Sequence, residues 1–579
     1  MYRHAGFFFN DGMFIDRADE LNFWSGKNRT DMAEPSGQHT MDRMVPPFKP
    51  GGARRPPLPL MILAAGIAAA TLLPMAYLAI RALESGFGVF EIVFRPRTLS
   101  VFLNTAILAG TVTAGSVIIG VLIAWLTVRT DLPWRKFWAT TTCLPLVLPS
   151  YVGAFALVGA LGPTGMVQSL LQPLGVERLP SIYGFPGAWL ALTLFTYPYV
   201  QLSVRGALRG LDPSLEDAAR SLGRSAPRVF REITLPHLRP SIHAGALLVV
   251  LYTLSDFGAV SLLQFNSFTR AIYVQYTSAL DRSAAAVLAM MLVMLTFVIL
   301  MTEYRMRGRA LYYRSSSGSR RPPTVVPLGK WRLPALIFVS LVSLMALGVP
   351  LTVIVYWLFR GLMAGEQFAP HAQIAFNSLI VSGQAAVAGV MAAFPIVILA
   401  VRHPGMVSRV CERCTYVAHS LPGIAVALAL VFFGARYVPA LYQSMAMLVF
   451  AYVILFLPLA VGSLRASMLQ LSPRLEEAGR ILGRSSGRVL WSVTFPLMRP
   501  GILMGLALVF LSCMKELPAT LILGPTGFNT LATRIWGATE EAFFARAAAP
   551  ALILVLVSAI SLWIMFAHEE GSGSRGRFR

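Results

Sequence analysis

The sequence predicts an all-α polytopic membrane protein in which two homologous six-helix halves follow one another in a single chain. Composition is the first reason: 56% of the 579 residues are hydrophobic, 13% are charged, and the mean hydropathy is +0.64. Soluble domains carry roughly 25% charged residues, so we expect most of this chain to lie in a bilayer. The second reason is an internal repeat, in which residues 212–240 return as residues 472–500.

Twelve segments are long and apolar enough to be predicted as transmembrane helices. A helix needs about 20 apolar residues to cross the hydrocarbon core of a bilayer. The first of these spans stands before the repeat and is expected to be peripheral. The predicted spans lie near 58–82, 101–128, 137–161, 182–204, 241–264, 284–304, 333–358, 374–401, 415–434, 441–464, 500–523 and 548–567.

The repeat begins within the second predicted span. There Asn104 aligns with Asn377, and Pro149 aligns with Pro422, at an offset of 273 residues. Around the repeated loops the offset is 260, so the first half is predicted to hold extra residues in an outer loop around 162–184. Both prolines interrupt apolar runs. Transporters place their pathway at such breaks because freed backbone carbonyls must face a cavity rather than lipid, although a simple kink fits each run equally well.

Basic residues indicate the orientation in the membrane. Most of the 49 Lys and Arg residues fall in the two tails and in alternate loops, which the positive-inside rule assigns to the cytoplasm. The net charge of +22 follows from this topology, and no basic stripe with interleaved aromatics favours a nucleic-acid partner. The predicted divisions are a disordered cytoplasmic N-terminal tail at 1–57, a first half at 58–310, a cytoplasmic linker at 311–332, a second half at 333–568 and a C-terminal tail at 569–579.

The repeated loops carry the strongest signal. Residues 212–240 read DPSLEDAARSLGRSAPRVFREITLPHLRP, and residues 472–500 read SPRLEEAGRILGRSSGRVLWSVTFPLMRP. Each starts with an oxygen-bearing side chain followed by proline, which is typical of a helix start. Each helix is then predicted to end at a glycine, Gly223 or Gly483. An amphipathic helix on the membrane surface is one interpretation, but surface anchoring requires neither a glycine nor a Leu-Pro at fixed offsets.

The spacing in these loops resembles the coupling loop of ABC importer permeases: Glu-Ala-Ala, three residues, Gly, nine residues, then Ile-x-Leu-Pro. Asp replaces Glu in the first copy, and Gly, Val and Phe replace Ala, Ile and Leu in the second. Two matches in one register make the signal specific. The resemblance implies the type I ABC importer permease fold and assigns ATPase coupling to Glu216, Asp217, Ala218, Ala219, Gly223, Leu235, Pro236, Glu476, Glu477, Ala478, Gly479, Gly483, Phe495 and Pro496.

A second resemblance narrows the family. The segment KELPATLILGPTGFNTLATRIW at 515–536 is similar to the second half of fused iron(III)-type importer permeases, and residues 148–168 point to the same group. It implies a two-in-one permease of the bacterial inner membrane that takes iron(III) from a periplasmic binding protein and releases it in the cytoplasm. Related fused permeases carry thiamine, phosphonates or other small solutes, so these cargoes stay open.

The same resemblance implies an external motor. Two copies of a cytoplasmic ABC ATPase would dock on the two loops and would bind ATP and Mg²⁺. The chain contains no GxxxxGK[ST] phosphate-binding motif. We therefore expect that it is not an enzyme and that it binds no cofactor of its own.

Two acidic residues lie within predicted spans, 260 residues apart, in LSDFGAVSLL and MKELPATLIL. Ionisable groups in a bilayer are costly and are candidates for function. Iron(III) is a hard cation that prefers oxygen ligands, so the predicted substrate pathway consists of Asp256, Glu516, Tyr151, Tyr197 and Tyr252. A structural interpretation is equally open, with a pair between Glu516 and its neighbouring lysine, a local turn at Asp256, and tyrosines that pack.

No fixed metal site is predicted. Cys411 and Cys414 form a CxxC, but no second pair or neighbouring His-x-His completes a zinc site. A membrane enzyme would need clustered histidines or carboxylates, whereas the eight histidines are scattered. A secondary transporter would also show twelve spans and a repeat, but it would not need capped helices with a shared Gly and Leu-Pro.

Overall fold

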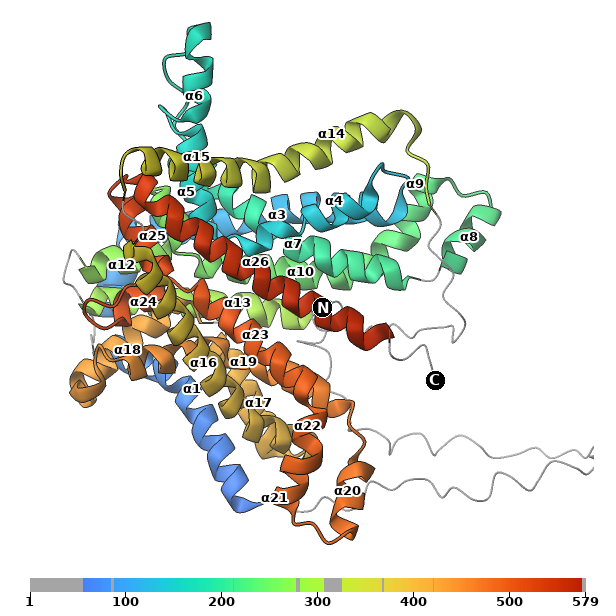
Figure 1. Cartoon of the computed structure of the whole chain (residues 1–579), viewed down its shortest axis with the longest axis vertical. Helices are drawn as coiled ribbons and strands as arrows, with labels where there is room; N and C mark the ends of the chain where they lie inside the picture. Colours follow the sequence, from blue (N-terminus) through green and yellow to red (C-terminus); the bar gives the residue numbers. More distant parts are fainter. Residues whose placement is uncertain are drawn as a thin grey trace, which may run out of the picture.

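The structure is a computed structural model, and it describes residues 56–84, 88–211, 213–277, 282–306, 325–366, 369–419 and 421–574 (Figure 1). Within these ranges the chain consists of helices joined by turns, which confirms the predicted all-α class. Most of the predicted N-terminal tail lies outside the described residues, as do 311–324 of the predicted linker and the last five residues of the chain.

The first half contains short and long helices in alternation. Its elements are α1 (Leu58–Glu84), α2 (Gly88–Val93), α3 (Pro96–Arg129), α4 (Arg135–Thr141), η2 (Leu144–Val147), α5 (Ser150–Leu161), α6 (Met166–Leu171), η3 (Gln172–Leu174), α7 (Phe185–Gly210), α8 (Pro213–Ser221), α9 (Ala226–Val229), η4 (Phe230–Thr234), α10 (Leu235–Ser255), α11 (Gly258–Leu262), α12 (Phe268–Thr277) and α13 (Arg282–Met306).

The second half repeats this order from α16 onward. Its elements are η5 (Gly329–Trp331), α14 (Arg332–Ser343), η6 (Leu344–Gly348), α15 (Val349–Met363), α16 (Ala369–Arg402), α17 (Met406–His419), α18 (Gly423–Tyr437), η7 (Pro439–Leu441), α19 (Met445–Leu469), α20 (Pro473–Ile481), α21 (Ser486–Val489), η8 (Leu490–Thr494), α22 (Phe495–Leu497), α23 (Arg499–Met514), α24 (Pro518–Leu523), α25 (Leu531–Glu540) and α26 (Phe544–Ser574).

The helices account for the predicted spans. Among the described residues, nine helices are long and apolar enough to cross a membrane, and two bent helix pairs raise that number to eleven. One bent pair turns by 70° between Ser486–Leu497 and Arg499–Met514. Helix α7, with 26 residues, adds a twelfth long helix where the span near 182–204 was predicted.

Pro149 and Pro422 interrupt the two halves at equivalent places. Each proline is the N-cap of a new helix, α5 or α18, with φ −61° and ψ 145° in the first half and φ −58° and ψ 137° in the second. Proline fixes φ near these values and offers no N–H for a preceding turn. The apolar runs are therefore truly broken at these prolines, a choice that the sequence alone left open.

Each half begins with a span that packs on the other half. Helix α1 lies at the periphery of the bundle yet contacts α16, α17 and α18, and the Tyr77 hydroxyl donates a hydrogen bond to Phe432 O at 3.3 Å. Helix α15 contacts α5, where a Cβ added at Gly159 would lie 3.0 Å from Val353 Cγ1. In Figure 1, blue α1 accordingly lies among the gold and orange helices of the second half.

Small residues let the long helices approach closely. A Cβ added at Gly120 of α3 would lie 2.9 Å from the carbonyl oxygen of Tyr197 in α7, and one added at Gly245 of α10 would lie 2.7 Å from Val200 Cα. Helices in a bilayer associate through such packing, because burial from lipid supplies no hydrophobic gain. Helices α3, α7 and α10 thus form a compact unit that carries the first repeated loop.

Candidate functional site

The two repeated loops adopt the same capped geometry. In the first loop (residues 212–240), Gly223 follows α8 with φ +78°, and in the second loop (472–500) Gly483 follows α20 with φ +78°. Side chains rarely adopt this left-handed conformation, which is why glycine ends so many helices. The prediction that the two helices end at Gly223 and Gly483 is therefore confirmed.

Matching hydrogen bonds close each corner. In the first loop, the Gly223 N–H donates to Arg220 O at 2.9 Å, and the next N–H reaches back to Ala219 O at 3.2 Å. In the second loop, the Gly483 N–H donates to Arg480 O at 3.0 Å, and the next N–H donates to Gly479 O, also at 3.2 Å. This satisfies carbonyls that the end of a helix leaves free, so each corner is a defined shape rather than a loose linker.

A buried acid anchors the first loop to the membrane helices. Arg129 Nη1 lies 3.2 Å from Glu216 Oε2, and the two side chains are only 2% and 6% exposed. The Thr234 hydroxyl donates to the other carboxylate oxygen of Glu216 at 2.8 Å. One carboxylate thereby joins α8, η4 and the last residue of α3.

The second loop repeats this anchor. Arg402, the last residue of α16, lies 2.8 Å from Glu476 Oε1, and the Thr494 hydroxyl donates to the same oxygen at 3.2 Å. The side chains of Arg402 and Glu476 are somewhat more exposed than their counterparts, at 15% and 13%. Sequence reasoning missed both arginines and both threonines, although they recur at the offsets already recognised, 273 for the arginines and 260 for the threonines.

The outer surface of each loop is exposed. Asp217 and Glu477 are exposed, as are Ala218 and Ala478, the residues that follow them. Ala219 and its counterpart Gly479 face inward, and a Cβ added at Gly479 would lie 3.0 Å from Val489 Cγ2. The four consecutive motif positions therefore divide, with the first and fourth buried or half-buried and the second and third exposed.

Apolar side chains project from the same surface. Leu222 and Leu482, which precede the two corner glycines, are 82% and 81% exposed, and Ile481 and Trp491 of the second loop are exposed too. Figure 1 shows α8 and α20 on the same side of the molecule. Exposed apolar groups ringed by charge are typical of a protein-binding surface.

The Leu-Pro pair of the first motif and the Phe-Pro pair of the second each begin a helix instead of joining this surface. Leu235 and Pro236 start α10, and Phe495 and Pro496 start α22, and all four are half-buried. The Phe495 ring stacks on Phe394 of α16 at a centroid distance of 5.8 Å. These four residues hold the loop to the helices behind it.

The two membrane-embedded acids occupy equivalent helix breaks. Asp256 follows α10 and is buried, and its carboxylate accepts hydrogen bonds from the Ser150 hydroxyl and from the Ala259 N–H at 3.0 Å. Glu516 follows α23 and accepts from the Ala519 N–H at 3.3 Å. Each acid therefore caps the short helix after the break.

The first turn of the broken helix differs between the halves to match its acid. Ser150 begins α5, and Gly423, its equivalent at the offset of 273, begins α18. A Cβ added at Gly423 would lie 2.6 Å from Glu516 Oε1. The first half thus combines serine with the shorter acid, and the second half combines glycine with the longer one.

The acid-bearing breaks of the two halves touch. A Cβ added at Gly258, two residues after Asp256, would lie 2.6 Å from Tyr151 Cβ and 3.2 Å from Leu517 Cδ2. Lys515 Nζ donates a hydrogen bond to Leu146 O in the first half at 2.8 Å. The alternative that Lys515 pairs with its neighbour Glu516 is therefore wrong, because Lys515 donates its hydrogen bond across the interface to the first half.

Four of the five predicted pathway residues, Tyr151, Tyr252, Asp256 and Glu516, lie near one another. The hydroxyl of Tyr151 is buried and has no hydrogen-bond partner among the described residues. Tyr252 lies one turn before Asp256 on α10 and beside Ser150. Tyr197 points elsewhere, since its buried hydroxyl donates to Thr142 O at 2.7 Å. Within the described residues, no three His, Cys, Asp or Glu side chains are placed to hold a metal ion.

The sequence profile of a known family, the binding-protein-dependent transport system inner membrane component, matches residues 116–305 and 385–571. The chain belongs to this family. Each match contains one repeated loop and one of the embedded acids, so the family unit occurs twice. Membership in this family and the apolar helices make the chain a multi-pass inner membrane protein, and they decide against a secondary transporter.

Individual relatives of this permease family extend the comparison. The chain is 35% identical to the Fe(3+)-transport system permease protein FbpB 2 of Haemophilus influenzae, over 88% of this chain and 98% of that relative. It is 24% identical to the ferric transport system permease protein FbpB of Actinobacillus pleuropneumoniae, over 78% and 69% of the two chains. It is 32% identical to the molybdenum transport system permease protein ModB of Escherichia coli over 196 residues, which cover 32% of this chain and 84% of that relative.

Proposed function

We propose that this chain is the fused permease subunit of an ATP-driven importer that moves iron(III) from a periplasmic binding protein to the cytoplasm. The observation that carries the proposal is the pair of capped loops on one side of the molecule. Each loop is anchored to the end of a long helix by an ion pair, which is buried in the first half and partly exposed in the second. This geometry suits a force applied from outside, because a push on α8 or α20 reaches α3 or α16 without passing through a flexible segment.

The motor in this proposal is a separate ATPase, of which two copies bind to each chain, one at each loop. The exposed leucines before Gly223 and Gly483 would enter a cleft of the ATPase, and Asp217, Glu477 and the loop arginines would set register through charges at the rim. The ATPase would bind ATP and Mg²⁺, and both loops and both termini would lie in the cytoplasm, as the distribution of basic residues favours.

Iron(III) as cargo rests on the names of the two ferric relatives and on the chemistry of the interface. Asp256, Glu516, Tyr151 and Tyr252 offer oxygen atoms, which a hard cation prefers. We propose that these groups line the route between the halves. We exclude Tyr197 from the route because its hydroxyl donates a hydrogen bond to Thr142 O.

A second candidate cargo is molybdenum, which the similarity to the molybdenum transport permease ModB favours. Thiamine, phosphonates and other small solutes are further alternatives. The test is to purify the chain with its ATPase and to measure ATP hydrolysis with the binding protein loaded in turn with iron(III), molybdate, thiamine or a phosphonate. We expect stimulation by the iron(III)-loaded protein. Stimulation by another load alone would change the cargo, and no stimulation by any load would reject the importer proposal.

A further inference from the structure

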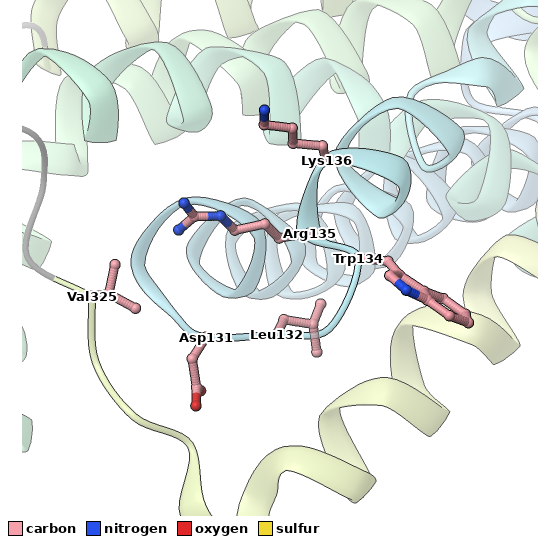
Figure 2. A pocket seen from close by; sticks show the side chains of 6 residues that line it. All are labelled: Asp131, Leu132, Trp134, Arg135, Lys136 and Val325. Carbon is pink, nitrogen blue, oxygen red and sulfur yellow. The ribbon is translucent and has the colours of Figure 1, made fainter.

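A pocket of about 520 Å³ opens where the end of α3 meets the end of the linker. Figure 2 shows Arg135 extending from the start of α4 across the opening toward Val325, while Trp134 points the other way. Within the described chain, neither the Arg135 nor the Lys136 side chain makes a hydrogen bond or an ion pair. The pocket is lined by Asp131, Leu132, Trp134, Arg135, Lys136 and Val325.

The linker closes one wall of this pocket through its backbone. The Val326 N–H donates to Arg129 O at 2.7 Å, and the Leu328 N–H donates to Asp131 Oδ1 at 2.8 Å. In Figure 2 the Asp131 carboxylate points away from Arg135. The only acid of the lining is thus engaged by the linker, and the open side of the pocket is positively charged.

The surroundings are those of a membrane interface. Trp134 is 77% exposed, and Trp331, just before α14, is also exposed. Exposed tryptophans of this kind sit at the level of lipid headgroups. From the same end, α14 and the turn after it carry an exposed apolar stripe at helical spacing, formed by Leu333, Ile337, Leu341 and Leu344.

The second half lacks the equivalent pocket lining. Residues 131–136 read DLPWRK, whereas 404–409, their equivalents at the offset of 273, read PGMVSR. Serine stands where Arg135 would be, and its hydroxyl accepts a hydrogen bond from the Gly405 N–H at 2.8 Å, so the turn closes on itself. Only Arg409 keeps a basic side chain. The feature therefore does not follow from the repeat and belongs to the first half alone.

We infer that this pocket binds the headgroup phosphate of an anionic phospholipid, with Arg135 and Lys136 as the phosphate ligands. The acyl chains lie along the apolar stripe of α14, and Trp134 packs at the level of the glycerol. That the lipid belongs to the inner leaflet rests on the orientation proposed above. The pocket lining begins two residues beyond Arg129, the residue that anchors the first loop.

The test is native mass spectrometry of the full chain, purified in detergent and titrated with phosphatidylglycerol or phosphatidylcholine. Two basic side chains at a membrane surface contribute enough to predict a fall of about thirtyfold in phosphatidylglycerol affinity for Arg135→Gln with Lys136→Gln. The exchange Arg135→Lys with Lys136→Arg should keep the affinity within about threefold, because the charges remain. Arg409→Gln is the matched control in the second half and should leave it unchanged.

Equal affinity for the two lipids, or unchanged phosphatidylglycerol binding in the double glutamine variant, would overturn the inference. Inorganic phosphate provides a third arm. If millimolar phosphate displaces the lipid from the wild-type chain and also binds alone, the pocket recognises free phosphate, and the lipid assignment is wrong. The two lipid arms need neither the ATPase nor the cargo, so their failure is distinguishable from failure of the proposed import function.

Discussion

Arg129 lies 3.2 Å from Glu216 in an almost fully buried ion pair that joins the end of α3 to α8. Taking two charges out of water is costly, so removal of one partner leaves the other uncompensated in the interior. Breaking the pair should therefore destabilise the protein by more than the intact pair itself contributes to folding. For this reason the pair holds the first loop firmly to α3. Arg402 and Glu476 do the same in the second half.

The first prediction concerns this anchor. Glu216→Ala should lower the free energy of unfolding by about 3–5 kcal/mol, because Arg129 is left buried and unpaired. The thermal midpoint of the purified chain measures the loss. Glu477→Ala is the control, since that side chain is exposed and its removal should change stability by no more than about 0.5 kcal/mol. Equal destabilisation by both changes would contradict the anchor.

The second prediction concerns the corner glycines. Gly223→Pro together with Gly483→Pro should abolish stimulated ATP hydrolysis while the spans stay folded, because proline cannot adopt φ +78°. Asparagine at the same two positions is the matched control, since it tolerates the left-handed region, and it should retain most of the stimulation. Unchanged hydrolysis in the proline variant would refute the role of these corners.

The third prediction tests the match between the embedded acids and the helix starts. Gly423→Ser should reduce iron(III) uptake, because its Cβ would force the Glu516 carboxylate to move from its present position. Adding Glu516→Asp should restore uptake, since it recreates the serine and aspartate of the first half. The coupling energy in this double-mutant cycle should be roughly 0.5–3 kcal/mol in stability. Additive effects of the two changes would show that the groups do not meet.

The fourth prediction concerns the contact between halves. Lys515→Leu removes the bond to Leu146 O, a charge-assisted hydrogen bond of the kind that contributes about 1.5–3 kcal/mol. We expect ATP hydrolysis without binding protein to rise, because the contact between the halves is weakened. Lys515→Gln, which keeps a donor, should raise it less. A fall in unstimulated hydrolysis in both variants would contradict a holding role for this lysine.

The sequence alone predicts the helix ends and the motif acids of the two loops, because these features depend on residues that are close together in the chain. Gly223 and Gly483 were predicted as helix ends because a corner between two helices needs a residue at positive φ. Glu216 and Glu476 were recognised through the same short motif. Spacing of this kind involves neighbours along the chain, and secondary structure fixes their relation before any tertiary contact forms.

The partners of those acids were beyond the sequence argument for a physical reason. Arg129 and Glu216 are 87 residues apart in the sequence. The offset between the two halves is 273 residues at Arg129 and 260 at Glu216, so one ungapped alignment of the halves cannot match both residues to their counterparts. Each half also begins with a span that packs partly on the other half, here called the exchange of first spans, and the sequence hides this packing in a similar way. An apolar run predicts that α1 lies in the membrane, but hydropathy is the same whichever helix it packs against.

That exchange has a further consequence for how the chain is made. When α1 first enters the membrane, the second-half helices that it contacts, α16 to α18, have not yet been synthesised, although α13 of its own half, which it also contacts, is made before them. If the linker were cut, the two halves would have to associate by diffusion in the plane of the bilayer. In one continuous chain, each half is held at a high effective concentration near the other. Fusion thereby guarantees one copy of each half and prevents the pairing of a half with its own duplicate.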